Sequence, residues 1–464
     1  MCRLPFQAQI SVIPSTYANL CSTKPRVFVP LGNQSMPASF ERRLFMLRIV
    51  HRNCAGMDVH KKFIAVCIAT TDFSGVTTYK KKQFSTFNSD LKACRDWLLK
   101  YGCSEVCMES TGKYWIPIFN VLEGHLHVVV ANPKYVRAIK GQKTDDKDAM
   151  WIADLFKFDI IPSSYIPIKE IRKLRELFRY RYNLVNARSS EKMRLQNSLT
   201  VSNIALGSVL TDTFGKSASA IIEYLLSGQD FEPEHCKRLL FKGAKNKADD
   251  VVSSIIGCEI SNDQALKMRL CREHTSFLDS VIGRLDKAIA ELSKPYNDLI
   301  QLAADVPGIT ETSARYIIAE IGADMTVFKS AKHLCSWAGL TPQNNESAGK
   351  KKSCRISRAG AYLKPLLVQC ALAAIKDKQN PYFRVKYDCI KKRRGHKRAI
   401  IAIARMILTC LYHMFLKKEA FQPSDIHYEE LPEQLLEKRK AHYIKQAIKL
   451  LEKEGMTVVP PTVA

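Results

Sequence analysis

The spacing of apolar residues predicts an α/β region in the first third of the chain. Between about residues 52 and 156, short apolar runs of strand length alternate with segments of helical period. We expect strands at 63–69, 76–82, 105–108 and 127–130, and helices at 89–98, 114–122 and 145–156. Ser89 is a candidate cap for the first helix. In this order two strands come first, and helices and strands then alternate. Such an order favours a mixed β-sheet.

The middle and the end of the chain have a helical pattern. Two sets of apolar residues at three- and four-residue spacing predict a pair of long helices, either an antiparallel coiled coil or part of a plain bundle. These sets are Leu174, Leu177, Leu184, Leu195 and Leu199, and Leu278, Val281, Leu285, Ile289 and Leu292. Shorter helices are expected at about 205–262. The late apolar run 399–415 contains Arg405 and His413, which favours a buried helix over a membrane span.

These patterns predict five regions. They are an extension at 1–45, expected to be disordered, an α/β domain at 50–165, a helical or coiled-coil linker at 166–300, a mostly helical domain at 301–417 and a tail at 418–464. Met36 and Met46 are alternative start residues. Near the start of the fourth region, Val306–Thr310 forms a Pro-Gly turn between two helical patterns. Such a turn indicates a helix-hairpin-helix that presents N–H groups to phosphate, or an ordinary helix connection.

Charge and cysteine content narrow the possible partners and the compartment. The chain of 464 residues carries 71 Lys and Arg against 45 Asp and Glu, a formal charge of +26. An excess of this size suits a polyanion such as DNA or RNA. The 15 cysteines are scattered and form no CxxC pair, which indicates free thiols in a reducing cytoplasm and not a disulfide framework or a zinc site. No signal peptide is evident.

Four acidic residues stand in an order that a metal-dependent nuclease would use. Asp58 lies on an expected first strand, Glu109 ends a second strand, and Asp145 and Asp148 open a helix on which they share one face. Each acid alone could be a surface carboxylate or a helix cap. Together, in a sheet of the ribonuclease-H kind, they predict a site for divalent metal ions that drive phosphodiester chemistry. Lys143 is a candidate phosphate contact beside it, as are His60 and Lys61.

A second group of candidate residues lies in the C-terminal part. Ser347 stands in a Gly-containing loop among cations, where it could attack phosphate or only donate a hydrogen bond to it. On spacing alone, the binding role is favoured. The candidate nucleic-acid contacts are Lys350, Lys351, Lys352, Arg355 and Arg358, and a second run of Lys391, Lys392, Arg393, Arg394, Lys397 and Arg398. Basic runs of this kind grip a backbone more than they read bases.

The two motif sets resemble the DEDD-type transposases of bacterial insertion sequences, relatives of the Piv site-specific invertase that are described as bridge-RNA-guided recombinases. The resemblance covers about residues 50–415. It rests on GMDVHK at 56–61, ESTG at 109–112, NP at 132–133, KTD at 143–145 with Asp148, PGI at 307–309, AGLTP at 338–342, ESAG at 346–349 and ISRAG at 356–360.

The resemblance implies a function and a site. A RuvC-like domain would bind Mg²⁺ through Asp58, Glu109, Asp145 and Asp148. A coiled coil would join it to a transposase domain in which Ser347 attacks DNA and forms a phosphoserine intermediate. The two parts would meet as a composite site between subunits of a dimer or tetramer. A noncoding RNA would select donor and target DNA, in the bacterial cytoplasm at the nucleoid and without a membrane partner.

One departure and two rival functions remain open. The family often has Gly directly after the serine, whereas here Ala348 precedes Gly349, so Ser353 and Ser357 are alternative nucleophiles. A metal-dependent, structure-specific nuclease of the junction-resolvase kind would need the four acids and water but no serine adduct. A non-catalytic nucleic-acid-binding protein would need only the basic loops and the glycine turn.

Overall fold

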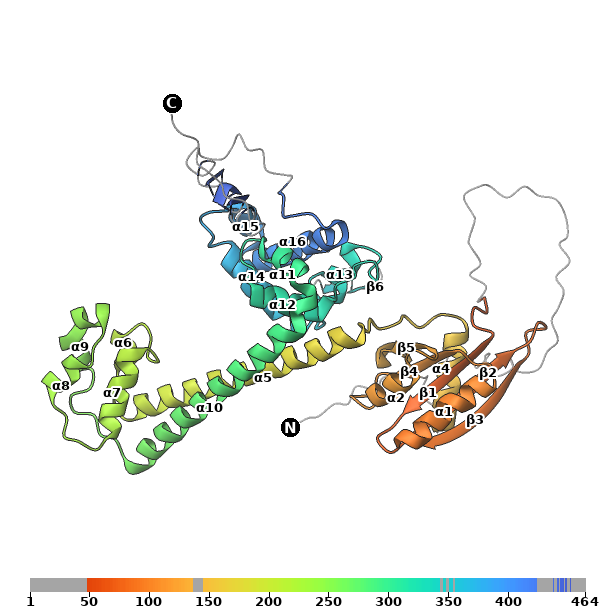
Figure 1. Ribbon diagram of the computed structural model, residues 1–464, viewed down its shortest axis with the longest axis horizontal. Coiled ribbons are helices and arrows are strands. Elements are labelled where there is room, and N and C mark those ends of the chain that lie inside the picture. The colour runs from red at the N-terminus through yellow and green to blue at the C-terminus, as the bar shows by residue number, and fades with distance from the viewer. Residues whose placement is uncertain are drawn as a thin grey trace, which may run out of the picture. The chain divides into compact units, whose positions relative to one another are not determined.

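The fold is described from a computed structural model, drawn in Figure 1. It describes residues 48–136, 145–342, 345–347, 350–353 and 355–423, with single residues between 437 and 451. The extension at 1–45, Lys143 and most of the tail after 423 lie outside the described residues. The chain divides into two compact units, residues 1–164 and 165–464, and each is described by itself.

A five-stranded mixed sheet forms the first unit. Its strands are β1 (Asn53–Val59), β2 (Phe63–Thr71), β3 (Thr77–Ser85), β4 (Glu105–Glu109) and β5 (His127–Ala131), in the order β3-β2-β1-β4-β5. β1 to β3 form an antiparallel meander, whereas β4 and β5 run parallel to β1. The predicted mixed sheet is therefore confirmed, and it is compatible with a RuvC-like domain. β1 is the central strand, and its residues from Cys54 to Val59 are all buried.

Within the described residues, four helices accompany the sheet. They are α1 (Asn88–Lys100), α2 (Trp115–Leu122), α3 (Pro133–Val136) and α4 (Asp145–Lys157). The prediction that Ser89 caps the first helix is wrong, because α1 begins at Asn88 after Phe87. Ser85 takes part in that turn instead, since its hydroxyl bonds to the Asp90 carboxylate at 2.6 Å and accepts the Phe87 N–H at 3.2 Å. The polar residue that forms hydrogen bonds at the N-terminus of α1 is therefore Ser85, which precedes the helix.

Helix α4 packs unusually close to the central strand. A Cβ built on Gly56 would lie 2.2 Å from the carbonyl oxygen of Ala149 and 2.4 Å from the backbone nitrogen of Ala153. Only glycine leaves room for this contact, because two backbone segments meet with no side chain between them. Two residues before it, the Cys54 thiol contacts the Ala153 carbonyl oxygen at 3.7 Å.

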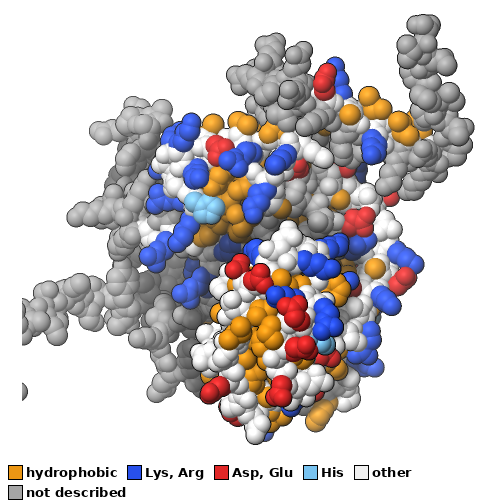
Figure 2. Space-filling view, turned by 90° about the vertical axis from the view of Figure 1, so that its left-hand side faces the viewer, with side chains coloured by type: hydrophobic (Ala, Val, Ile, Leu, Met, Phe, Trp, Pro, Cys, Tyr) orange, Lys and Arg blue, Asp and Glu red, His pale blue; other side chains and the backbone are white. Residues whose placement is uncertain are grey.

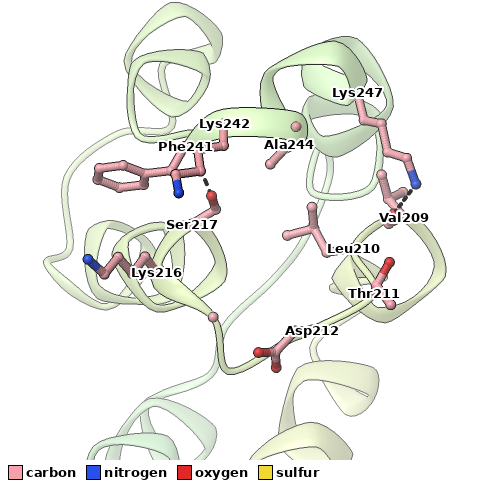
Figure 3. A pocket seen from close by; sticks show the side chains of 12 residues that line it. Val209, Leu210, Thr211, Asp212, Lys216, Ser217, Phe241, Lys242, Ala244 and Lys247 are labelled. Carbon is pink, nitrogen blue, oxygen red and sulfur yellow. Dashed lines mark hydrogen bonds between the residues drawn. The ribbon is translucent and has the colours of Figure 1, made fainter. Parts of the chain in front are cut away.

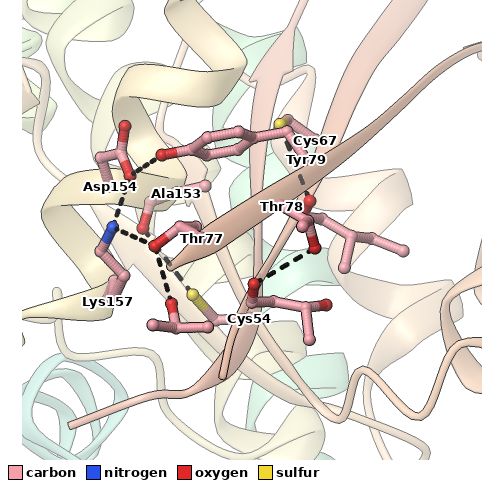
Figure 4. Close-up of polar contacts among 11 residues, drawn as sticks. Cys54, Cys67, Thr77, Thr78, Tyr79, Ala153, Asp154 and Lys157 are labelled. Atoms are coloured by element: carbon pink, nitrogen blue, oxygen red, sulfur yellow. Dashed lines mark hydrogen bonds and ion pairs between the residues drawn. The ribbon is translucent and has the colours of Figure 1, made fainter. Parts of the chain in front are cut away.

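Polar contacts also fix α4 to the edge strand β3 (Figure 4). The Tyr79 hydroxyl donates to the Asp154 carboxylate at 2.7 Å, and Lys157 donates to the same oxygen at 2.9 Å and to Thr77 at 3.1 Å. Burial and the hydrogen bond to Asp154 both raise the pKa of Tyr79, so this phenol stays protonated. The ammonium of Lys157 is buried with its partners satisfied, as a buried charge requires.

The second unit is built on a long helical hairpin, seen in Figure 1 as α5 and α10. The helices are α5 (Lys169–Val201) and α10 (Asn262–Ser293). Ion pairs from Arg181 to Asp286 and from Arg188 to Asp279 join residues whose numbers rise on one helix as they fall on the other, so the helices are antiparallel. The predicted long helices are confirmed. Leu292, expected in their seam, is 47% exposed instead.

Shorter helices cover the far end of this hairpin, and we call residues 202–261 the tip. They are α6 (Leu206–Val209), α7 (Lys216–Leu226), α8 (Pro233–Arg238), the 3-10 helix η1 (Lys242–Lys247) and α9 (Ala248–Ser253). Their apolar residues, including Ile221 and Val251, form a core with Leu195 and Leu199 of α5 and Met268 of α10. The tip is therefore fixed to both arms of the hairpin.

The other end of the hairpin joins a helical region with its own core. Its helices are η2 (Lys294–Tyr296), α11 (Asn297–Ala304), α12 (Glu311–Ile321), α13 (Ala331–Trp337), α14 (Leu363–Ala374), α15 (Tyr382–Arg394) and α16 (His396–Lys417), with strands β6 (Asn345–Ser347) and β7 (Lys350–Ser353) between α13 and α14. Within the described residues, α16 alone is long and apolar enough to span a membrane. Its residues Ile403, Ile407 and Leu411 are buried in this core, as the sequence predicted.

An ion pair with a buried carboxylate fixes the hairpin to this region. Glu320 of α12 is 2% exposed and accepts two hydrogen bonds from Arg179 of α5, at 2.8 and 2.9 Å. Arg175 donates to the carbonyl oxygens of Ala319 and Glu320 at the end of α12. The Arg179 guanidinium also lies 4.7 Å from the centre of the Tyr362 ring. The bidentate geometry of this pair constrains the docking angle of α5.

Candidate active site and nucleic-acid interface

Asp58 and Glu109 lie on neighbouring parallel strands. In the β1–β4 ladder Met57 pairs with Met108, and the two carboxylates follow directly after this pair. Residues at the same level of adjacent strands point to the same face. Cys54 is four positions before Asp58, and Cys107 is two positions before Glu109, so each cysteine lies on the same face of its strand as the acid. Both cysteines pack in the core against α4. Both carboxylates therefore stand on the side of the sheet that α4 covers.

The register of α4 brings its first turn level with Asp58. Cys54 contacts Ala153, and Gly56 lies against Ala149 as well as Ala153. Two residues advance a strand by about 6.6 Å, and four residues advance a helix by about 6 Å. Two residues further along β1 from Gly56 is Asp58. Four residues back along α4 from Ala149 is Asp145, the first residue of that helix. Asp58 and the first turn of α4 are therefore at the same level. Asp148 lies in the same first turn and is half-buried.

Asp58 is enclosed and already has a partner. It is 9% exposed, and its carboxylate lies 3.1 Å from Nε2 of His60. The His60 ring packs on Phe63, with 4.6 Å between the ring centres. A histidine held in this way orients the carboxylate. The sequence suggested His60 as a phosphate contact, whereas the structure engages it with Asp58.

The carboxylates fit a divalent metal only in part within the described residues. Asp and Glu oxygens are the ligands that Mg²⁺ takes from proteins. The described side chains contain no group of three or more metal-binding residues. The side chain of Asp145 lies outside the described residues, so the complete quartet is not seen. What the structure brings together is two carboxylates on one sheet face and the helix turn that carries the other two.

Ser347 lies at the end of a β-hairpin. Glu346 pairs with Lys351 and Ser347 pairs with Lys350, so Ser347 is the last paired residue before Ala348 and Gly349 join the two strands. A further bridge between Pro342 and Ile356 closes the base of the hairpin. The predicted loop is thus two short strands. The side chains of residues 343–352, including Ser347, Lys350, Lys351 and Lys352, lie outside the description.

Two glycines and a lysine hold the base of this hairpin. Gly339 and Gly360 have φ values of +70° and +67°, and a Cβ on Gly360 would lie 2.2 Å from the carbonyl oxygen of Ala338. Lys364 donates to the Ser357 carbonyl oxygen at 2.6 Å, and burial lowers the pKa of this lysine. The glycines of the AGLTP and ISRAG segments therefore allow the two ends of the hairpin to approach each other.

The alternative serines have local roles. The Ser353 hydroxyl accepts the N–H of Arg355 at 3.2 Å, and the Ser357 hydroxyl accepts the N–H of Ala359 at 3.3 Å. Each hydroxyl closes a turn of its own backbone, as serine commonly does in loops. Arg355 and Arg358 are exposed.

The second basic run spans a junction of two helices. Lys391, Lys392, Arg393 and Arg394 form the last turn of α15, and Lys397 and Arg398 follow in the first turn of α16. All six side chains are exposed. Gly395, with φ of +77°, turns the chain between the helices, and the Tyr387 hydroxyl lies 2.7 Å from Nδ1 of His396. The run is thus a dense positive surface at a rigid corner.

The glycine turn at Val306–Thr310 connects α11 and α12 as predicted. Gly308 has φ of +83°, and a Cβ there would lie 2.4 Å from the carbonyl oxygen of Cys370 in α14. Val306 and Ile309 are buried in the core. The Thr310 hydroxyl caps α12 by accepting the N–H of Ser313. The turn therefore has a packing role against α14.

Comparison with known proteins places the chain in a family. Residues 55–204 match a family described as transposase, and residues 300–388 match one described as transposase IS116/IS110/IS902 family. The chain belongs to this transposase family. The matched segments contain the four carboxylates and the serine hairpin. Membership makes the chain an enzyme that acts on DNA in transposition or recombination.

Individual relatives agree with this assignment. The pilin gene-inverting protein of Moraxella bovis is 24% identical over 378 residues, which are 79% of this chain and 96% of that protein. An uncharacterized 42 kDa protein of insertion element IS900 from Mycobacterium paratuberculosis is 30% identical over 160 residues, 34% of this chain and 39% of that protein. A putative transposase of Sinorhizobium fredii is 23% identical over 148 residues, 31% of this chain and 38% of that protein.

Several structural residues escaped the sequence reasoning. Gly56 was noted only as part of a motif, although it decides how closely α4 approaches the sheet. Lys157 and Tyr79 were not singled out from the sequence, yet they join α4 to β3. The available signal for Gly56 was a glycine within a strand, which often marks the close approach of another backbone. No comparable signal existed for Lys364, whose role depends on which segments fold together.

Proposed function

We propose that this transposase-family chain is a site-specific recombinase that cuts and rejoins DNA through a serine nucleophile and Mg²⁺ held by Asp58, Glu109, Asp145 and Asp148. The observation that carries the metal part is the alignment of Asp58 and Glu109 on one sheet face with the first turn of α4. Bound Mg²⁺ would polarise the phosphate and stabilise its developing charge. His60 would keep the Asp58 carboxylate in position.

The serine step conserves the phosphodiester bond energy. The Ser347 oxygen attacks a DNA phosphorus and loses its proton, a serine–phosphate bond forms, and the bond to one DNA oxygen breaks and leaves a free hydroxyl. A hydroxyl of the exchanged strand then attacks the same phosphorus, and Ser347 leaves and regains a proton. One ester is exchanged for another in each step, so no ATP is needed. Support comes from the position of Ser347 at the end of a short hairpin in a lysine-rich segment.

The basic surfaces supply the grip on DNA. We propose that Arg355, Arg358 and the run from Lys391 to Arg398 bind phosphates, with Lys143 and Lys350 to Lys352 as further contacts. The Val306–Thr310 turn is proposed as a helix-hairpin-helix-like element. As the resemblance of the motifs implies, a noncoding RNA would select the DNA, and a dimer or tetramer would combine the carboxylates and the serine at one phosphate. The enzyme would act in the bacterial cytoplasm, at the nucleoid.

A trapping experiment tests the serine step. The full chain is incubated with Mg²⁺, the RNA of its element and end-labelled DNA, and the mixture is separated on a denaturing protein gel. We expect a labelled protein band that is lost in Ser347→Ala. Ser353→Ala and Ser357→Ala serve as matched controls, since both serines close local turns in the same segment, and both variants should retain the band.

Two outcomes would change the assignment. Nicked DNA without any labelled protein would favour a metal-dependent nuclease that uses water, and Ser347 would then be a phosphate-binding residue. A band that survives in Ser347→Ala but disappears in Ser353→Ala or Ser357→Ala would transfer the nucleophile to that serine. Absence of both cleavage and adduct at every Mg²⁺ concentration would contradict the proposed enzyme.

A further inference from the structure

The tip of the helical hairpin differs in charge from the rest of the chain. Residues 202–261 contain six Lys and Arg against eight Asp and Glu, whereas the whole chain has 71 against 45. Figure 2 views the molecule from the tip side and shows acidic and basic side chains around exposed hydrophobic surface. The tip therefore does not share the excess of Lys and Arg over Asp and Glu that the whole chain has. Three of the six occur within the six residues of η1.

A pocket of about 460 Å³ lies between the start of α7 and η1 (Figure 3). Two hydrogen bonds fix its walls. The Ser217 hydroxyl accepts the backbone N–H of Phe241 at 2.9 Å, and Lys247 donates to the Val209 carbonyl oxygen at 2.9 Å. The pocket is thus held by contacts between separate segments. Lys216 and Lys242 also line it, and Phe241 and Lys216 extend on the side opposite to Lys247.

The cations beside this pocket differ from the other cations of the tip. Lys237 pairs with Glu234 and Asp249, both at 3.0 Å. Among the residues that the structure describes, Lys216, Lys242 and Lys245 form no ion pair, and all three are exposed. Asp212 also lines the pocket, but its carboxylate accepts the Phe214 N–H at 2.9 Å within its own turn. Uncompensated positive charge therefore gathers on one side of an otherwise acidic element.

An exposed aromatic ring stands among these cations. Phe241 is 53% exposed, although a phenyl ring gains from burial. Its backbone is fixed by the bond to Ser217, so the ring is presented from a defined position. Aromatic rings beside Lys side chains are the means by which proteins hold single-stranded nucleic acid, because bases stack on the ring and phosphates contact the cations. An acidic peptide would use the lysines but not the exposed ring.

We infer that the tip binds a single-stranded segment of nucleic acid, with a base stacked on Phe241 and the neighbouring phosphates on Lys216 and Lys242. This inference rests on the proposed function only in that both concern nucleic acid. It adds a contact on residues 211–247, outside the carboxylates, the serine hairpin and the run from Lys391 to Arg398. A single strand fits better than a duplex, since the bases of a duplex are stacked on each other and cannot cover the ring.

Photo-crosslinking of the full chain tests the inference without any need for cleavage. The protein carries Asp58→Ala to prevent reaction, and the probe is a mixed-sequence single-stranded DNA of about 15 nucleotides, near the upper end of common site sizes, that contains 4-thiothymidine. After irradiation and digestion, we expect a crosslinked peptide that includes Phe241. Lys216→Ala with Lys242→Ala should lower the yield of this peptide about tenfold and weaken its dependence on salt. The matched control, Lys237→Ala with Arg238→Ala, should leave the yield unchanged.

Substitutions of the ring separate stacking from a general loss of structure. Phe241→Trp should retain the crosslinked tip peptide, while Phe241→Ala should lose most of it, with unchanged helix content by circular dichroism. Absence of a tip peptide, equal yields in both lysine variants, or a similar loss in Phe241→Trp would overturn the inference. Displacement of the probe from the tip by polyglutamate as readily as by unlabelled single-stranded DNA would also overturn it. Failure of the recombinase proposal would show separately, in the trapping experiment on Ser347.

Discussion

Gly56→Ala is the substitution that most directly tests how the sheet and α4 build the carboxylate site. The added Cβ would lie 2.2 Å from the Ala149 carbonyl oxygen and 2.4 Å from the Ala153 nitrogen. Non-bonded atoms of this kind need more than 3 Å, so α4 must move by about 1 Å. Both close atoms belong to backbone, and no rotation of a side chain can relieve the contact. The displacement is therefore transmitted to the first turn of α4, where Asp145 and Asp148 lie.

A movement of this size is large on the scale of metal coordination. Mg²⁺ accepts oxygen ligands at about 2.0–2.1 Å and requires near-octahedral geometry, and useful sites tolerate deviations of about 0.2 Å. We therefore expect Gly56→Ala to lose DNA cleavage to a degree similar to the loss of a carboxylate. Overpacking of a core costs about 1–3 kcal/mol, which a folded domain can tolerate. Loss of activity should thus exceed loss of stability.

The assay compares cleavage at saturating Mg²⁺ with thermal unfolding of the same protein. Gly283→Ala is the matched control, because a Cβ at this helical position meets no atom within 4 Å. That change should leave cleavage intact and raise stability by about 0.4–1 kcal/mol. Wild-type cleavage by Gly56→Ala would refute the reasoning that α4 sets the metal geometry.

Three further predictions concern separate features. Asp58→Ala should abolish recombination and leave nucleic-acid affinity nearly unchanged in a filter-binding assay; wild-type recombination would exclude the metal site. Lys392→Ala should lower affinity for every DNA sequence and reduce the slope of log affinity against log salt by about 1, whereas a changed target preference would mean that this run reads bases. Glu320→Gln should lower the free energy of unfolding by about 3 kcal/mol, since it leaves the buried guanidinium of Arg175 and the bidentate partner Arg179 without a countercharge; chemical denaturation that gives less than 1 kcal/mol would contradict this.

The local spacing of apolar and polar residues determined which segments form strands and which form helices. The apolar runs at 63–69 and 127–130 became strands, and the leucine spacing around Leu195 and Leu278 became two long helices, because side-chain periodicity follows directly from backbone geometry. The position of Asp58 on a strand and of Asp145 at a helix start followed for the same reason. The family resemblance was also readable in the sequence, since motifs keep their order along the chain.

Tertiary structure decided which of these residues meet. The parallel pairing of β1 with β4 places Glu109 beside Asp58, although 51 positions separate them in the numbering. The contact of Gly56 with α4, the ion pair of Glu320 with Arg179 and the position of Lys216 beside Phe241 all bring together segments that are far apart in the chain. Sequence periodicity records which face of an element is apolar, but it holds no information about the distance between two backbones. That distance depends on the packing of the whole core, and here it determines where the four carboxylates proposed to bind metal can converge.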